Sequence, residues 1–86
     1  MRMHISVLVL SERETERYTI PLEVTPNDKI ESVKAQIEQI QQSLPSCKQL
    51  LVYAGQQLEN GCSLEKYGVE DGSTILLVFK PNGEEE

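Results

Sequence analysis

A single segment of helical periodicity stands among several strand-like segments, and this limits the folds open to the chain. Within residues 25–45, aliphatic residues recur at spacings of three and four, which predicts one helix with one buried stripe. Because one helix covers only one face of a sheet, the other face is expected to meet solvent and to alternate to polar residues. The predicted stripe consists of Ile30, Val33, Ile37 and Ile40.

Two local signals mark the ends of this helix. Asp28 is followed three positions later by Glu31, a spacing typical of a reciprocal capping pair at a helix N-terminus. Pro45 prevents the helix from running on, because the residue before a proline is disfavoured in helical conformation.

Strand-like segments precede the helix. Residues 3–10 and 18–24 alternate with period two, and their closeness in sequence predicts an antiparallel hairpin. Pro21 cannot donate a hydrogen bond to a neighbouring strand, so the second strand is expected at the edge of the sheet. The charged segment 11–17 is interpreted as the connecting turn.

Turn residues divide the chain after the helix into short elements. Residues 48–53 predict a third strand, 56–58 a short fourth strand and 74–80 the last strand. Residues 62–73 contain too many turn residues for more than a single helical turn. The predicted fold class is therefore α+β, with one helix packed on one face of a sheet.

Size and charge exclude several classes of protein. A chain of 86 residues makes at most one domain, and its small interior leaves little room for an enclosed active site or a buried cofactor, so no cofactor is expected. The formal net charge is −6, and half of it comes from the three glutamates at positions 84–86. Binding to nucleic acid is disfavoured because the basic residues are scattered singly.

The cysteines and the only histidine offer little chemistry. Cys47 and Cys62 occur without a secretory signal and are interpreted as free thiols in a reducing compartment, cytoplasmic or nuclear. His4 stands alone, so no two-histidine metal site can form, and no motif supports Cys47 as a nucleophile with His4 as its base. We expect neither a metal site nor enzymatic activity. No segment approaches the roughly 20 apolar residues of a membrane span.

Three strands do not show the polar face that one helix should leave. The positions of opposite parity to the core are apolar in the first, third and last strands. These positions are Leu8, Leu10, Leu50, Val52, Leu76 and Val78. One explanation is that exposed aliphatic residues are common and scattered. The other is one contiguous apolar patch that binds a partner, which requires the three strands to be neighbours.

Two stretches of the sequence resemble ubiquitin. "LEVTPNDKIESVKAQI" is similar to the segment that closes ubiquitin's first hairpin and opens its helix, and "KQLLVYAGQQLENGCSLEKYGVEDGSTILLVF" is similar to most of the remainder. The most diagnostic piece is "YAGQQLENG", in which a strand, a tight turn, a leucine and a second turn follow in fixed spacing. The resemblance covers about residues 3–80 and identifies a ubiquitin-like domain.

The resemblance implies a β-grasp fold with a mixed sheet of four or five strands. The first and last strands are then parallel at the centre, the third strand flanks the last, and the second lies at the edge. In ubiquitin-like domains the face opposite the helix is gripped by short receptor helices. By this resemblance, the partner-binding residues here are Leu8, Leu50, Val52, Ala54, Gly55, Leu76, Val78 and Lys80.

Departures from ubiquitin refine this expectation. Leu76 stands where ubiquitin has a histidine, and Leu50 stands where it has an arginine. The patch is therefore expected to be more apolar, with Lys80 as its nearest positive charge, and an acidic partner would gain less electrostatic steering. Gln56 replaces ubiquitin's best-known chain-linking lysine, so we do not expect chains to be built on this domain.

The C-terminal sequence bears on function. Conjugated members of the family end in a mobile Arg-Gly-Gly segment, whereas here Gly83 stands alone in "KPNGEEE". We therefore expect residues 1–80 to form a non-conjugated ubiquitin-like domain and residues 81–86 to be an acidic, disordered linker or tail. Met1 lies close to the first strand, so the domain is expected at the N-terminus of a larger protein.

The expected partners are proteasome receptor subunits or ubiquitin-interacting helices, bound by a monomer. Two alternatives remain open. The chain could be a modifier, or the precursor of one, conjugated through a processed C-terminus. It could also regulate a neighbouring enzyme domain of the same protein.

Overall fold

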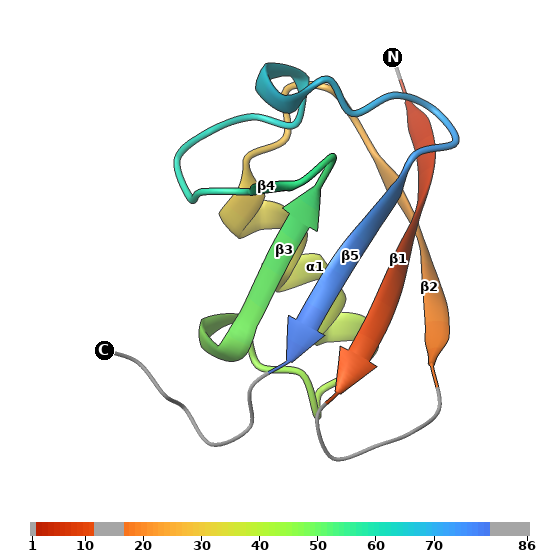
Figure 1. The fold of residues 1–86 in the computed structure, drawn as a ribbon, viewed down its shortest axis with the longest axis vertical. Coiled ribbons are helices and arrows are strands. Elements are labelled where there is room, and N and C mark those ends of the chain that lie inside the picture. The colour runs from red at the N-terminus through yellow and green to blue at the C-terminus, as the bar shows by residue number, and fades with distance from the viewer. Residues whose placement is uncertain (1, 12–16, 80–86) are drawn as a thin grey trace.

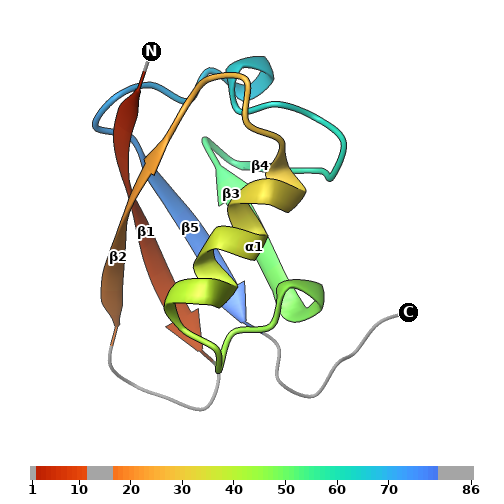
Figure 2. The same cartoon turned by 180° about the vertical axis from the view of Figure 1, so that it is seen from behind.

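One helix covers one face of a five-stranded sheet. The computed structural model describes residues 2–11 and 17–79. The helix, α1 (Ile30–Ile40), lies across the sheet, whose strand order is β2-β1-β5-β3-β4 (Figure 1 and Figure 2). β1 (Met3–Ser11) and β5 (Thr74–Phe79) are parallel at the centre. This is the β-grasp arrangement, and the predicted fold class is confirmed.

The remaining strands pair antiparallel with their neighbours. β2 (Tyr18–Val24) pairs with β1 and forms one edge of the sheet, as Pro21 predicts. β3 (Gln49–Tyr53) pairs with β5, and β4 (Gln56–Gln57) forms the other edge. Ala54 and Gly55 join β3 to β4 with φ angles of 54° and 80°, and two positive φ angles in a two-residue hairpin loop define a type I′ turn.

The described part of the chain contains two short 3-10 helices, and strands β3 and β4 differ by one residue from their predicted bounds. The single helical turn predicted within residues 62–73 is η2 (Glu65–Tyr67). A second turn, η1 (Ser46–Lys48), was not predicted, so β3 begins at Gln49 and not at position 48. The fourth strand ends at Gln57, one residue early, because Leu58 turns into the core and is 1% exposed.

The predicted helical stripe is wrong at its last member. Ile30, Val33 and Ile37 are buried, but Ile40 is 54% exposed. The helix ends at Ile40, well before Pro45, because Gln41 adopts an extended conformation. Leu44, in the turn that follows, enters the core in place of Ile40.

The predicted capping pair at the helix start is also wrong. Lys29 is the N-cap residue and makes no side-chain cap bond. The Asp28 carboxylate accepts hydrogen bonds from the Thr25 N–H (3.0 Å) and the Thr25 hydroxyl (2.9 Å) instead, and Glu31 accepts one from the Gly61 N–H at 2.7 Å. A side-chain cap is not needed at the first N–H, because the Ile30 N–H donates to the Cys62 carbonyl at 2.9 Å.

The core lies between α1 and the inward positions of the strands. Strands β1, β2, β3 and β5 all contribute buried hydrophobic residues, and the loops add four more, Leu44, Leu58, Leu64 and Val69. Five core residues in the middle of the sheet are exposed by 1% or less. These are Val7, Val9, Leu51, Ile75 and Leu77.

Candidate functional site

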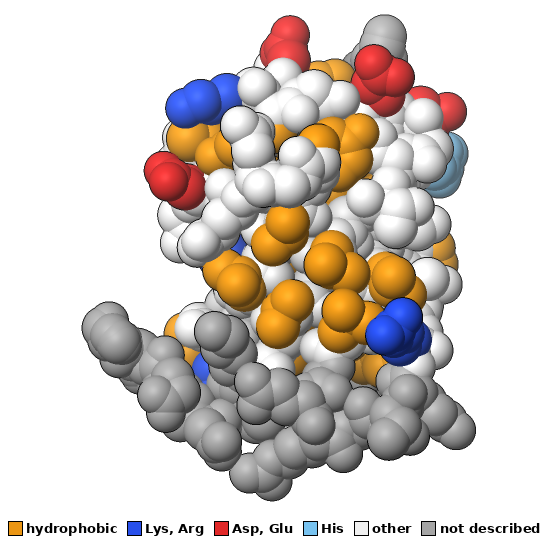
Figure 3. Space-filling model, viewed as in Figure 1, with side chains coloured by type: hydrophobic (Ala, Val, Ile, Leu, Met, Phe, Trp, Pro, Cys, Tyr) orange, Lys and Arg blue, Asp and Glu red, His pale blue; other side chains and the backbone are white. Residues whose placement is uncertain are grey.

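Six aliphatic side chains lie on the sheet face opposite α1, where Figure 3 shows hydrophobic side chains gathered over the central strands. In one row, Leu8 is paired with Leu76, and Leu76 is paired with Val52. In the next row, Leu10 is paired with Val78, and Val78 with Leu50. We call these six half-buried residues the aliphatic grid.

The grid exists because β1, β3 and β5 are apolar on both faces. Side chains alternate between the faces of a strand, so the buried residues between grid positions point toward α1. The sheet order makes the three strands neighbours. The prediction of one contiguous patch is therefore confirmed as geometry, whereas its role in binding stays a prediction.

The border of the grid is polar, and Figure 3 shows a Lys or Arg side chain against its edge. Gln57 on β4 is paired with Val52, and Thr19 on β2 is paired with Leu8. Ser6 and Thr74 are paired with each other, two positions before Leu8 and Leu76. Close cross-strand pairs share one surface, so these four side chains frame the grid.

The other predicted site residues lie at the ends of β3 and β5. Ala54 and Gly55 are exposed in the turn that follows β3, two and three positions beyond Val52. Lys80 follows β5 and lies outside the described residues, as do the predicted tail at 81–86 and most of the charged connection between β1 and β2.

The free edge of β2 is poorly suited to pairing with another strand. The Ser6 N–H donates to the Ser73 carbonyl at 3.0 Å, so Ser6 points its backbone toward β5. Because antiparallel pairs alternate, the backbone of its partner Pro21 points to the free edge, where it lacks an N–H. Two positions on, the Glu23 carbonyl accepts a hydrogen bond from Gln36 at 3.3 Å. The interrupted edge disfavours addition of an extended peptide.

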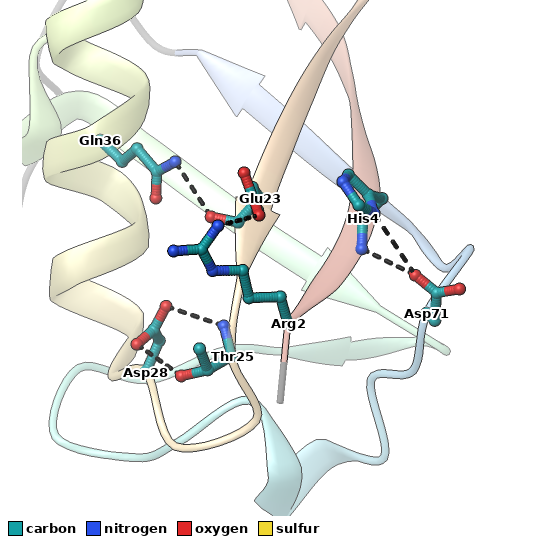
Figure 4. A network of polar contacts seen from close by, with 7 residues as sticks. All are labelled: Arg2, His4, Glu23, Thr25, Asp28, Gln36 and Asp71. Carbon is teal, nitrogen blue, oxygen red and sulfur yellow. Dashed lines mark hydrogen bonds and ion pairs between the residues drawn. The ribbon is translucent and has the colours of Figure 1, made fainter.

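Polar contacts join the start of β1 to the end of β2 and to the loop before β5 (Figure 4). Arg2 forms an ion pair with Glu23 at 2.8 Å. The His4 N–H donates to the Asp71 carboxylate at 2.7 Å, and its ring Nδ1 lies 4.0 Å from the same oxygen. All four residues are exposed, and such surface ion pairs contribute about 0–1 kcal/mol each. Sequence periodicity carries no signal for contacts between residues so far apart.

Ionisable groups on α1 and the neighbouring turns have shifted pKa values with local causes. The hydrogen bond from the Gly61 N–H lowers the pKa of Glu31, and hydrogen bonds from Ser46 lower that of Glu38. Burial lowers the pKa of Lys34, which is half-buried. A hydrogen bond to the Cys62 sulfur raises the pKa of Lys66.

The described acidic, histidine and cysteine side chains do not gather into a metal-binding set. Among residues 2–11 and 17–79, no three His, Cys, Asp or Glu side chains are placed to hold a metal ion. Cys47 and Cys62 are free thiols, the first exposed and the second half-buried. The same part of the chain contains no helix long and apolar enough to cross a membrane.

Comparison with known proteins agrees with this fold. The ubiquitin family model matches residues 5–82. Ubiquitin-like protein 1 of Schizosaccharomyces pombe is 35% identical over 81 residues, which are 94% of this chain and 96% of that protein. NEDD8-like protein RUB3 of Arabidopsis thaliana is 33% identical with the same coverage. The chain belongs to the ubiquitin family.

A third relative is much longer. AN1-type zinc finger protein 4 of Mus musculus is 32% identical over 62 residues, which are 72% of this chain but only 8% of that protein. Relatives of this chain are therefore found both as small proteins of similar length and as a small part of a long protein.

Proposed function

We propose that this ubiquitin-like domain is a non-conjugated, non-enzymatic interaction module that binds helical segments of other proteins through the aliphatic grid. The observation that carries the proposal is the pairing of six aliphatic side chains into one exposed surface across β1, β5 and β3. A contiguous apolar patch on a soluble domain usually marks a partner site. The proposed partners are proteasome receptor subunits or ubiquitin-interacting helices, met by a monomer in the cytoplasm or nucleus.

The contrast between the two exposed parts of the sheet supports this mode of binding. The free edge of β2 lacks a donor at Pro21 and has the Glu23 carbonyl occupied, so a partner gains little from backbone pairing there. On the grid, by contrast, each buried Å² of aliphatic surface contributes about 25 cal/mol before the costs of association. Helical partners suit such a face because their backbone bonds are already satisfied within the helix.

The proposed setting is a larger protein, which the domain would tether to its receptors. The long mouse relative supports this setting, since its matching region is a small part of the whole. Gly83 stands between Asn82 and Glu84 without a second glycine. This supports non-covalent binding through the face of the domain and not conjugation through its C-terminus.

The first test is an NMR titration with a ubiquitin-interacting helix and, separately, with proteasome receptor fragments. Shifts are expected to cluster on β3, β5 and β1. Val52→Ala and Val78→Ala are expected to weaken binding together while leaving the spectrum folded, because both side chains are half-buried on the outer face. Ile40→Ala removes an exposed aliphatic side chain of α1, on the other side of the sheet, and serves as the matched control. Wild-type affinity in the double variant would refute the grid as the site.

A second candidate function is a conjugated modifier or its precursor. The observation that favours it is the match over nearly the full length of small relatives named ubiquitin-like and NEDD8-like. Intact mass of the natural protein separates the two functions. A mature form ending at Gly83 supports the modifier, and a chain that continues past Glu86 supports the module.

A further inference from the structure

We infer that the partner helix lies across the strands of the aliphatic grid and presents an uncharged aliphatic stripe to it. This inference rests on the proposed function and adds to it the orientation and the chemistry of the partner. It follows from the dimensions of the grid and from the charges around it.

The grid is longer across the strands than along them. Its rows cross three strands, which are about 4.8 Å apart, so each row spans roughly 10 Å. The two rows are two residues apart along each strand, or roughly 6.6 Å. The long direction of the apolar surface is therefore perpendicular to the strands.

A helix matches this geometry in one orientation. Residues i and i+7 of a helix are roughly 10.5 Å apart, with another member of the stripe between them at i+3 or i+4. When the helix axis is perpendicular to the strands, its three stripe residues lie between the two rows, and each one packs over a different strand. Along the strands, the stripe leaves the grid after about one turn and meets polar Ser6 and Thr74.

The middle of the grid selects against charge in the stripe. None of the six side chains in the grid carries a charge, nor do Ser6, Thr19, Gln57 and Thr74, whereas Figure 3 shows a Lys or Arg side chain at the edge of the hydrophobic cluster. A carboxylate or ammonium placed over the middle of the grid would lose water against aliphatic side chains, which is unfavourable. Partner charges are therefore confined to the flanks of the helix.

A single helix also fits this surface better than a second copy of the domain. Stable protein pairs use about 20–30 residues on each partner, whereas the grid consists of six. The formal net charge of −6 also makes two copies repel each other. The small surface predicts modest affinity, suited to a short segment.

The test uses the 86-residue chain and a synthetic amphipathic helix with leucine at i, i+3, i+7 and a nitroxide label at one end. With the helix across the strands, broadening is expected to be strongest on one side of the sheet, at Gln57 of β4 or at Thr19 of β2. Stronger broadening at Ser6 and Thr74 than at both of these positions would mean a helix along the strands and would overturn the inferred orientation.

The chemistry is tested with the same peptide carrying glutamate in place of the central leucine. We expect it to bind at least about tenfold more weakly, the effect of roughly 1.4 kcal/mol. The leucine peptide should lose less than about twofold in affinity between low and high salt, because the six aliphatic side chains that it covers have no charges to screen. Equal binding of both peptides, or strong salt dependence, would overturn the uncharged stripe.

Two further outcomes distinguish a failure of the proposed function from a failure of this inference. If no helix shifts the signals of the grid, the proposed function itself fails. If the chain alone shows concentration-dependent broadening on the grid, the occupant is a second copy and the inference is wrong.

Discussion

Replacing Gln49 with leucine is expected to destabilise the domain without disturbing the grid. Gln49 is the buried polar residue at the start of β3, 5% exposed. Its amide group donates to the Leu44 carbonyl at 2.9 Å and to the Lys34 carbonyl at 3.1 Å. These two bonds tie β3 to α1 and to the turn between them. Leucine has a similar size but offers no donor.

The magnitude follows from the partners left behind. Losing the donor leaves the buried Leu44 carbonyl unpaired, which costs about 1–3 kcal/mol, and loss of the bond to Lys34 costs about 0.5–1.5 kcal/mol. The side-chain oxygen of Gln49 has no hydrogen-bond partner within the described part of the chain, so removing it returns about 1 kcal/mol. The expected net loss in the free energy of unfolding is about 1–3 kcal/mol.

Urea denaturation followed by circular dichroism measures this loss. The thermal midpoint should fall by about 4–8 °C for each kcal/mol in a domain of this size. Gln56→Leu, on the exposed strand β4, is the control and should change stability by less than about 0.5 kcal/mol. If Gln49→Leu is as stable as the parent chain, the two amide bonds make no net contribution and the reasoning is wrong. Affinity for the helical peptide should be retained because Leu50 points to the other face.

Two further predictions concern pH and association. Hydrogen bonds from Ser46 at 2.7 and 3.1 Å lower the folded-state pKa of Glu38 below its ordinary value of 4.5, so this contribution to stability is present above about pH 4.5 and is lost as the pH falls through the folded-state pKa. Urea titrations from about pH 7 to about pH 3 should show a shallower loss for Glu38→Gln, which keeps an acceptor oxygen but does not titrate; an unchanged slope would contradict the assignment. The double variant Pro21→Thr, Gln36→Ala restores a backbone donor at the edge of β2 and frees the Glu23 carbonyl. Light scattering should detect more self-association in this variant than in the control Pro21→Thr, Gln39→Ala, because an open strand edge can pair with another chain. Equal scattering from the two variants would refute the protective role of this edge.

Much of the fold could be predicted because the signals were local. Alternation of apolar residues located the strands, and Pro21 placed β2 at an edge. The helix start was mistaken because its first N–H is satisfied by the carbonyl of Cys62, a residue 32 positions after Ile30, and no local pattern reports such a contact. Ile40 was mistaken because periodicity does not tell where the chain leaves the helix.

Predicting the candidate site required both the alternation of residues along each strand and the order of the strands in the sheet. The alternation of residues along each strand placed Leu76, Val78 and their counterparts on the other strands on the face opposite the helix, where polar residues were expected. Only the order of strands decides whether they touch, and that order came first from the resemblance to ubiquitin. The contact of His4 with Asp71 had no signal in the sequence because it depends on how the loop before β5 packs against the start of β1.

The pairing of the first strand with the last has a consequence for biosynthesis. Ser6 is paired with Thr74, 68 positions later, so the central ladder cannot form until nearly the whole domain has left the ribosome. Until then Leu8 and Leu10 have no neighbours on β5, and no row of the grid is complete. Contacts between residues so distant in sequence also slow folding. A partner that recognises the grid therefore detects a finished domain and does not bind the nascent chain.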